Sequence, residues 1–289
     1  MTILVTGATG FVGRHVVAQL AEAGERVRAM TRTPSTARFA AGVEVVAGDL
    51  DDPSSLVDAV RGVERMYLFP VARTAREVVE LAVRAGVRRI VVLSSGAVEA
   101  GLDSDFHLPV ERAAEDSGVE WTHVRPGEFC SNVLHLWGPS VRAERVVRYP
   151  HDEIPSVPVH EADVAAVAVA ALLEDGHAGA AYSLTGPEVL TTADKVAAIG
   201  AALGEEVRHE EVTRERALEL LKAQGGWAAA NADFLLGFEP YSEAQEGFTE
   251  QELAEMFSSI APVPGVQQVT GRPARTFAQW ACDHVEDFR

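Results

Sequence analysis

Short apolar runs alternate with segments of helical periodicity through the first half of the chain. The near-continuous Val, Ile and Leu in these runs is typical of strands that are covered on both faces. The alternation predicts an α/β fold built on a doubly wound parallel sheet. The six runs that predict strands are Ile3–Val5, Arg26–Thr31, Val43–Leu50, Arg65–Pro70, Arg89–Ser95 and Trp121–Pro126.

The pattern loosens after residue 126, where Trp137-Gly138-Pro139, Tyr149-Pro150 and Ile154-Pro155 indicate loops and short elements. We therefore predict a sheet-containing core at residues 1–126 and a smaller, mixed, largely helical substrate region at residues 127–289. A strand and a helix near residues 157–190 are expected to return to the core. Further strands are predicted at 181–184 and 207–212, and helices at 164–173, 191–203, 213–223, 251–257 and from 275 onward.

Several helix ends carry capping signals. Thr74 with Glu77 and Thr249 with Glu252 have the spacing of a capping box. Asp163 is expected to cap the alanine-rich helix that follows it.

The first strand runs into a glycine-rich turn and then into a helix. The three glycines have the spacing G-x-x-G-x-x-G, in which the first permits a tight turn, the second lets a pyrophosphate approach the backbone, and the third lets helix and strand pack closely. The N–H groups and the positive dipole end of the helix then face the phosphates. The alternative is a glycine turn that binds nothing. The predicted dinucleotide loop consists of Gly7, Ala8, Thr9, Gly10, Phe11, Val12 and Gly13.

The end of the second strand carries arginine where an NAD-binding unit would carry an acidic residue. Arg32 ends this strand, and Arg38 follows closely. A guanidinium suits a 2′-phosphate, and a charge-assisted hydrogen bond of about 1.5–3 kcal/mol would favour NADP(H) over NAD(H) by roughly one to two powers of ten. The alternative is that both arginines are solvated surface residues.

Other polar and aromatic residues follow the remaining strands. In doubly wound sheets, ligands bind outside the carboxyl ends of the strands, so these residues are expected to gather there. Asp49 would lie near the adenine, although it could equally be an ordinary turn carboxylate. The expected set is the glycine loop, Arg32, Asp49, Phe69, Ser94 and Arg125-Pro126-Gly127.

Composition and charge narrow the class of protein. The formal net charge of −18 argues against affinity for nucleic-acid phosphates or anionic membranes. Cys130 and Cys282 lie far apart, without the spacing of a disulfide framework or a zinc site. The first strand begins near residue 2, and the apolar helix pattern at 164–173 is too short for a bilayer. We expect a cytoplasmic monomer or homodimer that acts on a small molecule.

On these motifs the chain resembles the atypical short-chain dehydrogenases, and within them the NmrA-like NAD(P)-binding proteins, a group that includes quinone oxidoreductase-like enzymes. The motifs are Thr6–Gly13, Arg32, Gly48–Leu50, Ser94-Ser95 and Val124–Gly127, and the likeness covers about the first 190 residues, through His160–Ala165.

The resemblance implies a Rossmann fold and a role for each matching position. Gly7, Gly10 and Gly13 would hold the pyrophosphate and Arg32 the 2′-phosphate. Further cofactor contacts are implied for Asp49 and Leu50 at the adenine, for Leu68, Phe69, Pro70 and Ser94 along the cofactor, and for Pro126 to Phe129 at the nicotinamide. Substrate contacts are expected from Phe129, Asn132 and Trp137.

The chain departs from the carbonyl-reducing members of the superfamily at one point. Those members use a tyrosine as proton donor with a lysine four residues on, whereas the corresponding stretch here is His107-Leu108-Pro109-Val110-Glu111. Pro109 places His107 at a helix entrance, where its imidazole could donate a proton. The alternative is a surface or capping histidine. Ser94 is a second candidate, and no third ligand accompanies His107 and Glu111 to form a metal site.

These features favour an NADPH-dependent oxidoreductase that transfers hydride directly to a small hydrophobic carbonyl, enone or quinone. Such a transfer depends on proximity and orientation more than on a tyrosine acid. Two alternatives keep the cofactor: a redox sensor that reports NADP(H) to a protein partner without turnover, and an isomerase or cyclase assisted by the cofactor.

Overall fold

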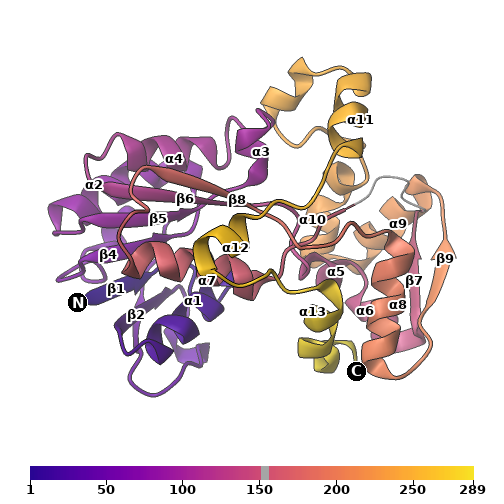
Figure 1. Cartoon of the computed structure of the whole chain (residues 1–289), viewed down its shortest axis with the longest axis horizontal. Helices are drawn as coiled ribbons and strands as arrows, with labels where there is room; N and C mark the ends of the chain where they lie inside the picture. The colour runs from indigo at the N-terminus through magenta and orange to yellow at the C-terminus, as the bar shows by residue number, and fades with distance from the viewer. Residues whose placement is uncertain (151–155) are drawn as a thin grey trace. The chain divides into compact units, whose positions relative to one another are not determined.

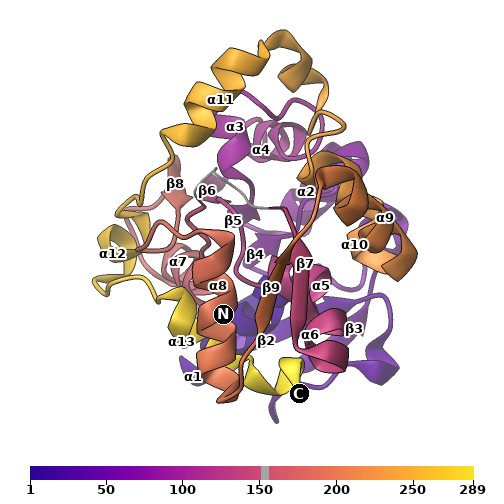
Figure 2. The same ribbon diagram turned by 90° about the vertical axis from the view of Figure 1, so that its right-hand side faces the viewer.

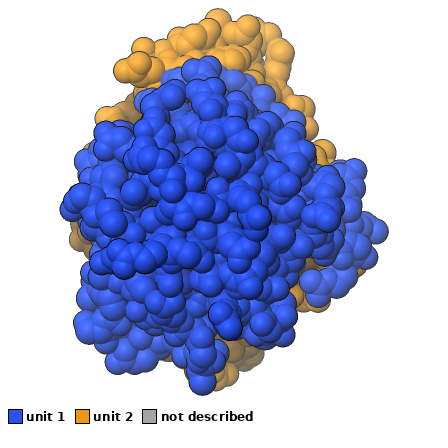
Figure 3. Space-filling view, turned by 90° about the vertical axis from the view of Figure 1, so that its left-hand side faces the viewer, with its two compact units in different colours: residues 1–127, 161–184, 264–272 blue, residues 128–160, 185–263, 273–289 orange. Residues whose placement is uncertain are grey.

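The computed structural model describes residues 1–150 and 156–289, so the loop predicted at Ile154-Pro155 lies outside the described residues. The chain divides into two compact units, coloured separately in Figure 3. Unit 1 comprises residues 1–127, 161–184 and 264–272, and unit 2 comprises residues 128–160, 185–263 and 273–289. Unit 1 thus draws two segments from the second half of the chain.

Unit 1 is built on a seven-stranded sheet whose order is β3-β2-β1-β4-β5-β6-β8. Every neighbouring pair is parallel, which confirms the predicted doubly wound α/β fold. The strands are β1 (Thr2–Val5), β2 (Arg26–Thr31), β3 (Glu44–Ala47), β4 (Arg65–Leu68), β5 (Arg89–Leu93), β6 (Glu120–Pro126) and β8 (Ala180–Leu184).

Helices cover both faces of this sheet, as Figure 1 shows. On one face α1 (Phe11–Glu22) packs against α7 (Glu161–Leu173), and α7 also contacts α12 (Gly265–Thr270). On the other face α2 (Ala75–Arg84) packs against α4 (Leu108–Glu115). All five residues of β5 are buried, as expected for a central strand between two helical layers.

Two predicted caps are wrong, one because the helix begins earlier and the other because the side chain bonds elsewhere. Helix α7 begins at Glu161, so Asp163 lies within its first turn instead of capping it. Thr74 makes no side-chain cap bond to α2, and its hydroxyl donates to the carbonyl of Leu50 at 2.7 Å. The capping box at Thr249 is present, since its N–H donates to the Glu252 carboxylate at 2.8 Å.

Unit 2 is mostly helical and contains one small sheet. Strands β7 (Val146–Tyr149) and β9 (Arg208–Glu211) pair in parallel and lie side by side in Figure 2. Trp137, Phe277 and Trp280 lie in its buried apolar core. Its helices are α5 (Asn132–Leu136), α6 (Gly138–Glu144), α8 (Thr192–Leu203), α9 (Arg214–Gln224), α10 (Gly226–Leu235), α11 (Glu250–Ser258) and α13 (Phe277–Asp283).

Short helices complete the described chain. A four-residue helix, α3 (Gly96–Glu99), follows β5, and the 3₁₀ turns are Pro34–Thr36, Pro53–Leu56, Ala72–Thr74, Glu243–Gly247 and Val285–Phe288. Within the described residues, no helix combines the length and the apolar character needed to cross a membrane.

Candidate functional site

The sheet order reverses direction at β1, which lies between β2 and β4. In doubly wound sheets this switch point opens a crevice at the carboxyl ends of the strands. The loops that leave β1 and β4 are joined there by Thr6, whose hydroxyl donates to the Tyr67 carbonyl at 3.0 Å and accepts from the Phe69 N–H at 2.8 Å. The glycine loop and Phe69 therefore meet at the expected ligand position.

The three glycines of the loop meet different physical requirements. Gly7 has φ +58, a left-handed conformation that favours glycine. A Cβ on Gly13 would lie 2.1 Å from the Gly7 carbonyl oxygen, so a side chain there would push α1 away from the turn. A Cβ on Gly10 would meet only that same oxygen, at 3.2 Å, and Gly10 is exposed. Gly10 therefore presents bare backbone to solvent.

The N-terminus of α1 fits an anion. Gly10 is its N-cap residue, no side chain caps the helix, and its first turn holds no acidic residue. The positive end of the helix dipole is thus not neutralised by a carboxylate of the helix's own first turn. Ala8 and Val12 are buried at 0% and 5% exposure, so these two residues would contact a dinucleotide only through their backbone.

The two candidate arginines differ in their surroundings. Arg32 is exposed after the end of β2 and makes no hydrogen bond or ion pair to any residue that the structure describes. The Arg38 guanidinium donates to the carbonyls of Ser35 and Ala37, at 3.0 and 2.8 Å. Arg32 is therefore available to an anionic ligand, whereas Arg38 is held against its own loop.

Two of the predicted cofactor residues are core residues. Leu50 and Leu68 are 7% and 2% exposed, and their side chains pack in the buried cluster of unit 1. Only their backbone atoms remain to contact a cofactor, and the placement of both residues along the cofactor stays a prediction. The Asp49 carboxylate accepts the N–H of Asp51 at 3.0 Å, as the turn alternative predicts. Phe69 is 41% exposed and is followed by the partly buried Pro70.

A buried ion pair lies beside the end of β6. The Arg125 guanidinium binds both carboxylate oxygens of Glu111, at 2.8 and 2.6 Å. Burial raises the pKa of Glu111, but the hydrogen bonds and the positive charge of Arg125 outweigh burial and lower it. Glu111, at the position where carbonyl-reducing members of the wider superfamily carry a lysine, is thus the acceptor of a bidentate salt bridge. Pro126, next in sequence, is buried.

Ser94 belongs to this ion-pair cluster. It is 3% exposed, and its N–H donates to the Val124 carbonyl at 2.7 Å. Its buried hydroxyl makes no hydrogen bond to a residue that the structure describes, and its roles as a proton donor and as a cofactor contact stay predictions.

His107 lies at the entrance of α4, but its ring is not the cap of that helix. His107 occupies the N-cap position without a side-chain cap bond. The carboxylate of Asp103 accepts the backbone N–H of His107 and also lies 2.7 Å from its Nδ1. Sequence reasoning missed Asp103. The available signal was an aspartate four residues before the histidine.

The candidate substrate residues belong to unit 2. Phe129 and Asn132 are partly buried, at a β-bridge to Val159 and at the first position of α5, respectively. Trp137 is 2% exposed and packs in the core of unit 2, so its side chain offers little surface to a substrate. Lys195, which the sequence did not single out, has its Nζ 5.5 Å from the centre of the Trp137 ring.

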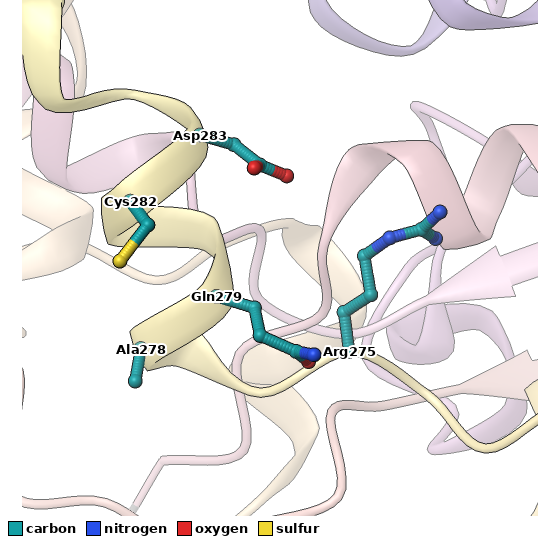
Figure 4. Close-up of a pocket in the computed structure, with 5 residues that line it drawn as sticks. All are labelled: Arg275, Ala278, Gln279, Cys282 and Asp283. Atoms are coloured by element: carbon teal, nitrogen blue, oxygen red, sulfur yellow. The ribbon is translucent and has the colours of Figure 1, made fainter.

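Two other features of the described residues are not assigned a function. Glu111, Glu115 and His123 could bring ligand atoms within 4.8 Å of one another. However, Arg125 already binds Glu111, and Glu115 lies 3.1 Å from His123 Nε2, so these groups are accounted for as ion pairs. In unit 2 a cavity of about 440 Å³ contains no predicted site residue. Its lining, shown in Figure 4, is Arg275, Ala278, Gln279, Cys282 and Asp283.

The fold and the glycine loop define a dinucleotide-binding protein of the atypical short-chain dehydrogenase class. The NmrA-like family matches residues 1–252. A (4-alkanoyl-5-oxo-2,5-dihydrofuran-3-yl)methyl phosphate reductase of Streptomyces griseus is 41% identical over 295 residues, covering 99% of each chain. An NAD(P)H azoreductase of Xenophilus azovorans is 34% identical over 298 residues, again covering 99% of each chain.

A solved structure agrees with these relatives. The NADPH-dependent quinone oxidoreductase of Escherichia coli, complexed with NADPH, has a TM-score of 0.76 and 26% identity, covering 97% of this chain and 99% of that one. The chain belongs to the NmrA-like family. It is an NAD(P)H-dependent oxidoreductase.

Proposed function

We propose that this protein is an NADPH-dependent reductase that transfers hydride directly to a small hydrophobic enone, quinone or related carbonyl compound. The observation that carries the proposal is the 41% identity, over the full length, to a reductase whose named substrate holds a C=C bond conjugated to carbonyl groups. Azo and quinone groups, named for two further relatives, are likewise conjugated acceptors of hydride. The shared chemistry is reduction of an electron-poor, conjugated double bond.

The residues of the dinucleotide loop fit the cofactor that this reaction needs. Bound NADPH would supply the hydride. Gly10 and the N-terminus of α1 would hold its pyrophosphate, and Arg32 its 2′-phosphate. Phe69 offers an exposed apolar surface at the switch point. His107, partly exposed at the entrance of α4, would give the proton that the reduced acceptor requires.

The proposal is tested by following NADPH oxidation with a panel of quinones, enones and alkanoyl butenolides, the butenolides with and without a methyl phosphate group. We expect turnover with at least one conjugated acceptor, and a product heavier by two hydrogens in mass spectrometry. Tight NADPH binding without oxidation by any acceptor would contradict the reductase and support the sensor alternative.

The choice of cofactor is tested separately at Arg32. Replacing Arg32 by alanine should weaken NADPH binding by about 10- to 100-fold, because a charge-assisted hydrogen bond contributes about 1.5–3 kcal/mol, and should leave NADH binding nearly unchanged. Isothermal titration with both cofactors measures this. Arg38→Ala is the matched control, since that guanidinium is held by its own loop. Equal losses of affinity for NADPH and NADH would show that Arg32 does not bind the 2′-phosphate.

A further inference from the structure

One buried carboxylate, that of Asp103, organises the segment that connects β5 to α4. Its Oδ1 accepts hydrogen bonds from the N–H groups of Phe106 and His107, at 3.1 and 3.0 Å. Its Oδ2 lies 2.7 Å from Nδ1 of His107. The Asp103 side chain is completely buried, whereas that of His107 is 21% exposed. The two oxygens thus hold the backbone and the ring of the same residue.

The charge on Asp103 decides how the imidazole is protonated. Burial alone would raise the pKa of Asp103, but the hydrogen bonds from His107 and from the Phe106 N–H outweigh burial and lower it to about 2. The ionised carboxylate is only an acceptor, so Nδ1 of His107 must carry a proton. Nε2 is then the nitrogen that exchanges a proton with a ligand.

The position of this pair suits a ligand. His107 is the N-cap residue of α4, in the segment that follows the carboxyl end of β5, and ligands of doubly wound sheets bind at that edge. Phe106, the preceding residue in the sequence, is 52% exposed and offers an apolar side chain to a ligand.

We propose that Asp103 is a positioning residue that acts through His107: it holds Nδ1–H and stabilises the imidazolium, which gives its Nε2 proton to the reduced acceptor. This inference rests on the proposed reductase function. When the acceptor takes a hydride from the reduced nicotinamide, a C–H bond forms and the π electron pair moves to oxygen or to the α-carbon. The Nε2–H bond of His107 breaks, and its proton goes to that atom. Water returns a proton to Nε2 before the next turnover.

The test begins with Asp103→Asn. The amide oxygen can still accept the backbone N–H groups, so the NH₂ group faces Nδ1 and disfavours the imidazolium. With an accepted enone or quinone we expect kcat to fall about 100-fold, a typical loss for general acid catalysis, and KM to change by less than about threefold. Nitrogen NMR of histidine-labelled protein should show the neutral ring of His107 protonated at Nδ1 in the parent protein and at Nε2 in the variant. An unchanged tautomer would overturn the proposal.

A double-mutant cycle separates positioning from folding. His107→Gln should cost a similar factor, and Asp103→Asn added to it should cost nothing more, because Asp103 acts only through the imidazole. A further tenfold loss in the double variant would show a structural role and contradict the proposal. Full activity of His107→Gln would show that His107 is not the proton donor, and it would leave the reductase function intact. If no acceptor is reduced, the NMR comparison still decides whether Asp103 sets the tautomer.

Discussion

Replacing Gly10 by valine is expected to abolish binding of NADPH and NADH alike while the fold is retained. Gly10 is exposed at the N-cap of α1 with an extended backbone, φ −74 and ψ 172, which valine adopts readily. Its side chain would occupy the place of the pyrophosphate. We expect affinity for both cofactors to fall by at least about 100-fold, which corresponds to ~2.7 kcal/mol.

Calorimetric titration measures the loss, and thermal unfolding shows whether the fold survives. Saturating NADPH, at a hundredfold excess over its Kd, should stabilise the parent protein by about 2.7 kcal/mol and the valine variant not at all. Gly13→Ala is an instructive contrast, because its Cβ would lie 2.1 Å from the Gly7 carbonyl oxygen and should destabilise the folded protein itself. Normal NADPH affinity in Gly10→Val would show that the pyrophosphate does not bind at Gly10.

The parallel sheet was predictable because its signal is local and repeated. A strand covered on both faces must be apolar almost throughout, and β5, Arg89–Leu93, is buried at every position. The glycine loop was equally readable, since a left-handed Gly7 and the close approach of Gly13 to Gly7 are requirements that only glycine meets. The fold class and the dinucleotide loop therefore follow from short segments.

Elements that depend on distant partners were not predictable. Strand β7, Val146–Tyr149, is a short segment whose partner, β9, lies some sixty residues further on. Helix α12 returns to unit 1, where Gly265 approaches the carbonyl of Ser183 so closely that a Cβ would lie 2.1 Å from its oxygen. Neither segment carries a local sequence pattern that predicts such a contact.

For the candidate site, the sequence predicted which residue types are present better than it predicted which residues contact one another. The sequence singled out His107 and Glu111 at the positions where carbonyl-reducing members of the wider superfamily carry a tyrosine and a lysine. It could not show that Glu111 binds Arg125 with both oxygens, or that Asp103 holds His107. Both pairings depend on how α4 and its preceding loop pack in three dimensions. For the same reason Trp137, which looked like a substrate contact, proved to be 2% exposed.

The Glu111–Arg125 pair leads to a second large expected effect, on stability. Replacing Glu111 by alanine should lower the free energy of unfolding by about 3 kcal/mol, because removal of one partner of a buried pair costs ~3–5 kcal/mol and Arg125 keeps some access to solvent. Chemical denaturation measures this difference. Glu80→Ala is the matched control: its pair with Arg84 is exposed and should contribute less than about 0.5 kcal/mol.

The double variant E111M/R125M identifies the source of the loss. Replacing both charges with apolar side chains of similar size should recover most of the stability, since no unpaired charge remains buried.

The pH dependence of the stabilisation by Glu111 has a defined sign. The folded-state pKa of Glu111 lies below its ordinary value of 4.5, so the stabilisation is present above that pH and fades as pH falls further. The difference between the parent protein and Glu111→Ala should therefore narrow in acid; a gap that widens there would show that the charge of Glu111 is not what stabilises the fold.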